Sequence, residues 1–263
     1  MSRVDAPYTQ GTPCWVDLMA SDQQAAIDFY KDLFGWSAEV GTEETGGYAM
    51  CLLNGRPVAG IGQAMAMGDQ PAPAPAWTTY LASTDADASA AKVTANGGQV
   101  LMPPMDVTTV GRMFLAVDPA KAMFGVWQPK DFFGAQTVNE PGALCWNEMN
   151  TRDATSSAAF YQAAFGLASQ PMDGMTGYFG LHIDGNLVGG LQDISGEMFP
   201  AELPPHWLTY FAVDDTDSTV DAHVKAGGNV MVPPTDTPVG RMAVLADPQS
   251  AVFAIIQLAG LPE

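Results

Sequence analysis

Apolar side chains recur at helical spacing in several segments of the chain. Between residues 22 and 35 they form one face of a predicted helix, made by Ala26, Ile27, Tyr30, Leu33 and Phe34. Asp22, preceded by Ser21, is a typical helix start, and Gly35 lies where a left-handed residue ends a helix. The same signals predict a second helix that opens at residues 85–87 and ends at Gly97-Gly98.

Strand-like runs follow each predicted helix. Residues 48–53 and 58–61 flank Asn54-Gly55, a dipeptide that favours a two-residue hairpin, and Asp184-Gly185 is its later counterpart. Residues 111–117 and 123–128 are predicted to flank Asp118-Pro119 in the same way. With one strand before each helix, the pattern predicts the order β-α-β-β-β four times.

The second half of the chain repeats the first. Cys14-Trp15 returns as Cys145-Trp146 and Phe29-Tyr30 as Phe160-Tyr161, both at an offset of 131 residues. The offset then falls to 130 and to 129, as single-residue gaps in loops would produce. Gly97-Gly98 returns as Gly227-Gly228, and Gly111-Arg112-Met113 as Gly240-Arg241-Met242. We place the boundary between residues 134 and 142 and predict two domains of two modules each, residues 1–134 and 135–263.

Composition narrows the classes of partner. Ten lysines and arginines against 29 acidic residues give a formal net charge of −19, so nucleic acid and anionic membrane surfaces are not expected partners. We find neither a membrane-spanning run nor a secretory leader and expect a cytoplasmic protein. Three cysteines without a CxxC pair indicate neither a disulfide framework nor a thiolate zinc site.

The module order, the Phe-Tyr and Phe-Gly pairs of the helices and the Asp-Pro turns together resemble the vicinal oxygen chelate superfamily of glyoxalases, bleomycin-resistance proteins and extradiol dioxygenases. The chain is long enough for two cup-shaped sheets. This length and the Gly-Arg-Met motifs look most like actinobacterial glyoxalase-like members, some of which accompany aromatic polyketide pathways. The resemblance implies an α+β fold. Four βαβββ modules in two tandem halves would each form a cup-shaped, partly closed sheet, with helices outside and a cavity inside.

The resemblance also implies where metal ligands would stand. In metal-dependent members, His, Gln or Glu from the first strand of each module and from a late strand hold a divalent ion. Those positions fall here on or next to residues that are not such ligands: Trp15, Trp146, Thr78, Leu208, Trp127, Ile256, Ile61 and Leu191. We therefore expect no metal and no other cofactor. A displaced site at His206 and Glu148 stays an alternative, while His182 is interpreted as structural and His223 as solvated.

Strand periodicity predicts which side chains face the two cups. The first strand of each half directs Trp15 and Asp17, or Trp146 and Glu148, inward. Further predicted cup residues are Tyr80, Trp127, Tyr210 and His206. Aromatic walls with one carboxylate suit an apolar ligand that carries a hydroxyl or amine. The alternative is that the tryptophans only fill a vestigial cavity.

These features predict a metal-free protein that binds a hydrophobic, aromatic small molecule, for sequestration, self-resistance or support of natural-product biosynthesis. A biosynthetic enzyme is a further candidate partner. The alternative function is a metal-independent isomerase, lyase or hydroxylase component in which Asp17 or Glu148 acts as general base. Arg112 and Arg241 occupy matching repeat positions and could hold an oxyanion or pair with an internal aspartate. Motifs of serine hydrolases, P-loop proteins and zinc proteases are absent from the sequence.

Overall fold

The computed structural model describes residues 2–66 and 71–259. The first half contains β2 (Pro13–Ala20), α1 (Gln23–Phe34), β3 (Ser37–Val40), β4 (Ala49–Leu53) and β5 (Arg56–Gln63), then β6 (Ala76–Ala82), α2 (Ala86–Ala95), β7 (Gln99–Val107), β8 (Gly111–Val117) and β9 (Met123–Pro129). The second contains β11 (Leu144–Thr151), α3 (Ala154–Phe165), β12 (Ala168–Pro171), β13 (Tyr178–Ile183) and β14 (Asn186–Asp193), then β15 (His206–Ala212), α4 (Thr216–Lys225), β16 (Asn229–Thr237), β17 (Gly240–Ala246) and β18 (Val252–Leu258). The short elements are β1 (Ser2–Arg3), the 3-10 turn η1 (Glu43–Thr45) and β10 (Thr137–Val138).

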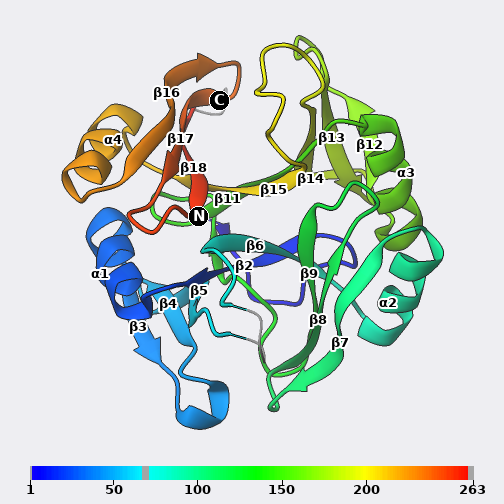
Figure 1. The fold of residues 1–263 in the computed structure, drawn as a ribbon, viewed down its shortest axis with the longest axis horizontal. Coiled ribbons are helices and arrows are strands. Elements are labelled where there is room, and N and C mark those ends of the chain that lie inside the picture. Colours follow the sequence, from blue (N-terminus) through cyan, green and yellow to red (C-terminus); the bar gives the residue numbers. More distant parts are fainter. Residues whose placement is uncertain (1, 67–70, 260–263) are drawn as a thin grey trace.

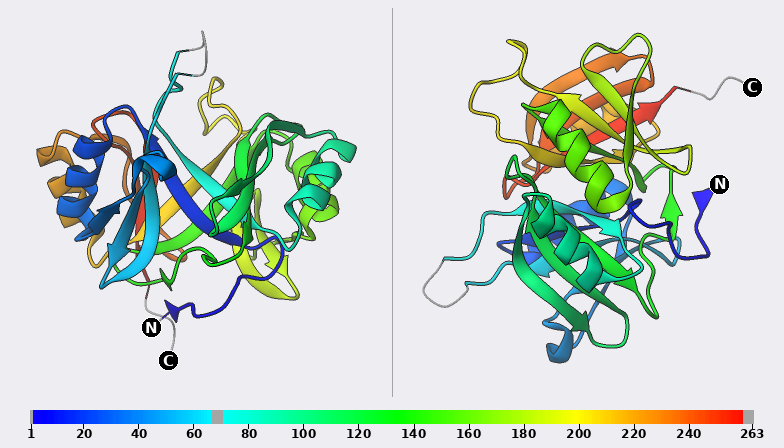
Figure 2. Two further views of the ribbon diagram at one scale, coloured as in Figure 1. Left: turned by 90° about the horizontal axis from the view of Figure 1, so that it is seen from below. Right: turned by 90° about the vertical axis from the view of Figure 1, so that its right-hand side faces the viewer.

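The main strands of each half form one sheet, β1 alone joining the second sheet through β10, and the predicted order of four βαβββ modules is confirmed. The first sheet runs β3-β4-β5-β2-β6-β9-β8-β7, and the second runs β12-β13-β14-β11-β15-β18-β17-β16. At the centre of each sheet, the first strands of the two modules pair antiparallel, β2 with β6 and β11 with β15. Both sheets curve into open cups, with helices on the outside (Figure 2).

Local signals explain where the helices and hairpins begin and end. Each helix starts at an aspartate whose side chain accepts a backbone N–H three residues later, from Asp22 in α1 to Asp215 in α4. The hairpin turn at Asn54-Gly55 has φ angles of 51° and 75°, and its counterpart in the second half has φ angles of 50° and 80°. In both turns the two central residues adopt the left-handed backbone conformation that such dipeptides favour.

The helices of the two halves pack against each other rather than within one half. Figure 1 shows α1 beside α4 on one side of the molecule and α2 beside α3 on the other. One hydrophobic core combines Phe34 and Trp36 of the first half with Phe211 and Phe253 of the second. The other core mixes the second and third modules in the same manner. Each half therefore supplies only part of two shared cores.

Two hydrogen-bonded chains cross between the halves inside these cores. Trp77 Nε1 donates to the Tyr30 hydroxyl at 3.0 Å, and that hydroxyl donates to Asp247 Oδ2 of the opposite half at 3.0 Å. The matching chain runs from Trp207 through Tyr161 to Asp118, at 2.9 and 3.2 Å. Asp118 and Asp247 are almost completely buried, and burial raises the pKa of both carboxyls. Each phenol thus joins an indole of its own half to a carboxyl of the other.

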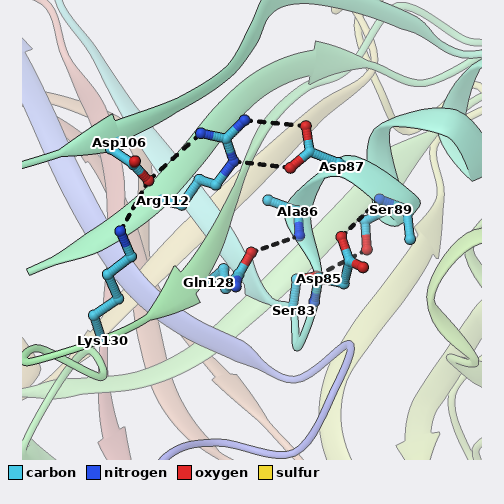
Figure 3. Close-up of polar contacts among 10 residues, drawn as sticks. Ser83, Asp85, Ala86, Asp87, Ser89, Asp106, Arg112, Gln128 and Lys130 are labelled. Atoms are coloured by element: carbon cyan, nitrogen blue, oxygen red, sulfur yellow. Dashed lines mark hydrogen bonds and ion pairs between the residues drawn. The ribbon is translucent and has the colours of Figure 1, made fainter.

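Arg112 and Arg241 hold helices to their sheets on the outer surface. Arg112 makes a two-pronged ion pair with Asp87 at the start of α2, at 2.9 and 3.0 Å, and also reaches Asp106 on β7 (Figure 3). Arg241 pairs with Asp217 on α4 and Asp236 on β16 in the same arrangement. Both arginines therefore pair with aspartates, but these are exposed aspartates of the surface and not the internal ones considered for them.

Two sequence interpretations are wrong in detail. The turn at Asp118-Pro119 is not a two-residue hairpin: it extends to Ala122, whose N–H donates to the Asp118 carboxyl at 2.9 Å. His223 is not solvated but fully buried, between Phe29 and Phe253 of the shared core.

In the described part of the chain, no helix has the length and apolarity needed to cross a membrane.

The crossing chains generate a stability prediction. Tyr161→Phe removes the donor to Asp118 and the acceptor of Trp207, so it should lower the free energy of unfolding by about 2 to 4 kcal/mol. Tyr8→Phe removes a single partly buried hydrogen bond to the Ala135 carbonyl and should cost about 1 kcal/mol. Urea unfolding measured by fluorescence and circular dichroism should give one coincident transition for each variant. Equal losses for the two variants would contradict the role of the crossing chains.

Candidate functional site

A buried carboxyl group lies on the inner face of the first cup. Asp17, on β2, is 4% exposed, and its Oδ2 accepts hydrogen bonds from the hydroxyls of Tyr80 at 3.0 Å and Tyr48 at 3.3 Å. Trp15 lies two residues earlier on the same face of β2, and its Nε1 donates to the Tyr48 hydroxyl at 3.0 Å. The four side chains form one connected polar network beneath aromatic walls.

The second cup places the same types of side chain at the matching positions, with a longer acid. Glu148, on β11, is 8% exposed and accepts from the Tyr210 hydroxyl at 3.2 Å and from Asn150 Nδ2 at 3.1 Å. Trp146 Nε1 donates to the Tyr178 hydroxyl at 2.9 Å, as Trp15 does to Tyr48. Duplication of the chain has therefore preserved the arrangement of indole, two phenols and carboxyl.

Glycines beside each carboxyl make room for the phenols. Gly60 is paired with Asp17 across β2 and β5, and a methyl group there would overlap the Tyr48 hydroxyl. Gly190 stands in the same relation to Glu148 and to Tyr178. The missing side chains at these two positions allow the tyrosine rings to lie across the sheet.

Burial sets the protonation of both acids. Loss of water raises the pKa of Asp17 to about 7, although the bonds from Tyr80 and Tyr48 act in the opposite direction. Burial likewise raises the pKa of Glu148, opposed by hydrogen bonds from Tyr178, Asn150 and Tyr210. Each cup therefore holds an acid whose proton is retained to higher pH than in an exposed carboxyl.

The two cups differ in how they are covered. The Phe132 ring, in the segment after β9, lies edge-on to Trp15 at 4.9 Å and 5.9 Å from the Trp127 ring, and Trp15 is only 3% exposed. Trp146 is partly exposed, and none of the ring pairs found within residues 2–66 and 71–259 includes it. The repeat counterpart of Trp127 is the smaller Ile256. Among the described residues, the second cup is the more open one.

His206 adds a polar group to the second cup only. It is paired with Asn150 across β11 and β15, where the first cup has Ala76 opposite Met19. His206 Nδ1 lies 2.8 Å from the Pro204 carbonyl, which can only accept, so Nδ1 carries the proton. Burial lowers the pKa of His206, which leaves Nε2 of the neutral ring as an acceptor. Glu148 and Asn150 thus lie two residues apart on one face of β11, and His206 lies opposite Asn150 on β15.

The donor set of the cups does not fit the three-ligand metal centres of the resembled superfamily. Each cup offers one carboxyl, which already accepts hydrogen bonds from phenols, and the second adds His206. Within residues 2–66 and 71–259, no group of three or more His, Cys, Asp or Glu side chains could surround an ion. His182, whose Nδ1 lies 3.0 Å from the Gly180 carbonyl, belongs to β13 and does not join the network.

Sequence periodicity did not identify three residues that contact the side chains predicted to face the cups. Tyr48 and Tyr178 complete the two networks, and Phe132 covers the first cup. The tyrosines share the repeat offset of 130 with Gly60 and Gly190, a signal that could have identified them. Phe132 carries no such signal, because it lies in an irregular segment.

Two hollows lie outside the cups, where the halves meet. One is about 290 Å³ and is lined by residues that include Asn139, Pro141 and Val213. The other, about 300 Å³, lies between α1 and the start of α4. Neither contains one of the predicted site residues.

Comparisons with known proteins agree with this architecture. The family model of the Glyoxalase/Bleomycin resistance protein/Dioxygenase superfamily matches twice, at residues 14–126 and 143–255. The glyoxylase-like protein CFP32 of Mycobacterium tuberculosis is 44% identical over 255 residues, which cover 95% of this chain and 96% of CFP32. The anthracycline biosynthesis protein DnrV of Streptomyces peucetius is 38% identical over 267 residues, covering 95% and 94% of the two chains.

Solved structures share the fold at low sequence identity. A Mn(II)-bound glyoxalase from Novosphingobium aromaticivorans superposes with a TM-score of 0.65 at 17% identity, covering 95% of this chain and 83% of that one. The 2,3-dioxygenase LapB from Pseudomonas sp. KL28 gives a TM-score of 0.65 at 13% identity, with coverages of 97% and 96%. The two matches of the family model, together with the 44% identical relative, establish that the chain belongs to the Glyoxalase/Bleomycin resistance protein/Dioxygenase superfamily.

Proposed function

We propose that the second cup binds a hydrophobic, aromatic small molecule. The observation that carries this proposal is the partly exposed Trp146 beside a row of inward-facing apolar side chains, which are Leu208, Tyr210, Ile256 and Met242. Glu148 and Asn150 lie on the same face of β11, and His206 lies opposite Asn150. An aromatic wall with a short polar edge suits a planar ring system that carries a hydroxyl or amine.

The relatives support the choice of ligand class. DnrV is named for anthracycline biosynthesis, and anthracyclines are built on planar, hydroxylated polycyclic quinones. A protein that holds such a molecule would serve sequestration, self-resistance or transfer to a biosynthetic enzyme. We therefore take 1,4-dihydroxyanthraquinone as the probe.

Binding should depend on the open cup. We predict that 1,4-dihydroxyanthraquinone quenches tryptophan fluorescence at micromolar concentration, and that Trp146→Ala weakens its affinity about tenfold or more through lost stacking and burial. Trp15→Ala is the matched control and should change affinity less than about threefold, because Phe132 already lies against Trp15. Glu148→Gln should weaken the dihydroxy compound more than unsubstituted anthraquinone. Equal effects of the two tryptophan variants would overturn the assignment to the second cup.

We also propose that this binding needs no resident transition metal, since each cup supplies too few ligands of the right type. Elemental analysis of the purified protein should find well under one equivalent of Zn, Fe, Mn, Ni or Co. A stoichiometric metal that only a chelator removes would contradict this, and loss of that metal in Glu148→Gln and His206→Ala would place it in the second cup.

A metal-independent enzyme is the second candidate function, favoured by the Asp17 pKa of about 7, which suits a general base near neutrality. If either acid acts as the base, Asp17→Asn or Glu148→Gln should abolish turnover while affinity changes only a few-fold. A binding protein would show the converse pattern, with affinity altered and no turnover to lose.

The raised pKa of Asp17 also predicts how stability depends on pH. Between about pH 4 and pH 7 the unfolded chain loses the Asp17 proton while the folded protein retains it, so the wild type is progressively destabilised. A rise in the pKa of Asp17 from about 4 to about 7 corresponds to about 4 kcal/mol in the free energy of unfolding. Urea titrations should therefore show Asp17→Asn gaining about that much relative to wild type as the pH rises through this window. Parallel pH profiles for the two proteins would show that Asp17 is not buried as a proton-retaining acid.

A further inference from the structure

The first cup already contains an aromatic ring. Phe132 lies edge-on to Trp15, with an interplanar angle of 85°, and its ring also meets Trp127 at 70°. Trp127 Nε1 donates to the Phe132 carbonyl at 2.9 Å, and Phe132 N–H donates to the Val110 carbonyl at 3.0 Å. The chain itself thus places a single six-membered ring against two indoles at the inner face of this cup.

Asp17 retains an unused hydrogen-bonding atom on the same face. Both phenols bond to Oδ2, and Oδ1 is buried without a hydrogen-bond partner in the described part of the chain. A buried polar atom in this condition costs free energy, and in folded proteins such atoms usually have a partner. The corresponding acid of the second cup, Glu148, has no such atom among the described residues. Asp17 Oδ1 can therefore meet a polar group of an incoming molecule.

We propose that the first cup is a second binding site, specific for a single aromatic ring with one hydroxyl, and that Phe132 is an internal occupant which this ligand displaces. A phenol is the ring of phenylalanine with an added hydroxyl, so it can repeat the contacts of Phe132 with Trp15 and Trp127. Its hydroxyl would supply the missing partner of Asp17 Oδ1. This site is independent of the ligand proposed for the second cup.

The competition with Phe132 sets the expected affinities. A ligand that binds only when the side chain has moved away has its apparent affinity reduced by the small fraction of open molecules. The wild type should therefore bind phenol weakly. Removal of the Phe132 ring removes the competitor and should strengthen binding.

The test compares 4-fluorophenol with 4-fluorotoluene by fluorine NMR titration. Phe132→Ala should bind 4-fluorophenol about tenfold or more tightly than wild type, and about tenfold more tightly than it binds 4-fluorotoluene. Phe133→Ala is the matched control, because Phe133 is the adjacent phenylalanine and forms none of the ring pairs of this cup. It should behave as wild type. Phe132→Leu should show a smaller gain and provides a second variant if the alanine protein does not fold.

Two outcomes would overturn the proposal. Equal or stronger binding of 4-fluorotoluene by Phe132→Ala would indicate a simple apolar cavity. A phenol preference that persists in Phe132→Ala with Asp17→Leu would show that Asp17 is not the partner of the hydroxyl. An affinity of Phe132→Ala no higher than that of Phe133→Ala would remove Phe132 as the competitor. Adding Trp146→Ala to Phe132→Ala should leave phenol binding intact, so failure of the second-cup ligand can be distinguished from failure of this site.

Discussion

The helices of each half are buried between their own sheet and the opposite half, and this arrangement organises the whole molecule. Each curved sheet carries two helices on its outer side, and those helices also pack against apolar side chains of the opposite half. The buried chains from Trp77 through Tyr30 to Asp247, and their counterparts, add directional bonds to that contact. Because the outer faces are covered in this way, the inner faces of both sheets are free to form cups.

The cups show how duplication can preserve a network while changing its access. In both halves an indole donates to one phenol and a second phenol donates to a carboxyl, and a glycine beside the acid accommodates one of the rings. The surroundings have diverged: Phe132 covers Trp15, whereas Trp146 is partly exposed and is accompanied by His206. Similar chemistry at the bottom of the two cups is thus combined with different coverage.

Most of the fold could be predicted from sequence because its signals are local. Aspartate caps, Asn-Gly and Asp-Gly turns, and the tandem repeat fix the elements and their order, and strand periodicity places Asp17 and Glu148 on the inner faces. Long-range contacts were less accessible. His223 has the surroundings of a surface helix in sequence, yet it is buried between Phe29 of the opposite half and Phe253 of its own. Phe132 belongs to an irregular segment, so no periodicity indicates which way its ring points.

The location of a bound aromatic molecule tests this account most directly. Crystals grown with 1,4-dihydroxyanthraquinone should show the ring system against Trp146, with a polar edge toward Glu148, Asn150 and His206. Electron density for the ligand in the hollow between the halves, beside Asn139 and Val213, with the second cup unchanged, would contradict the proposal that the second cup is the binding site.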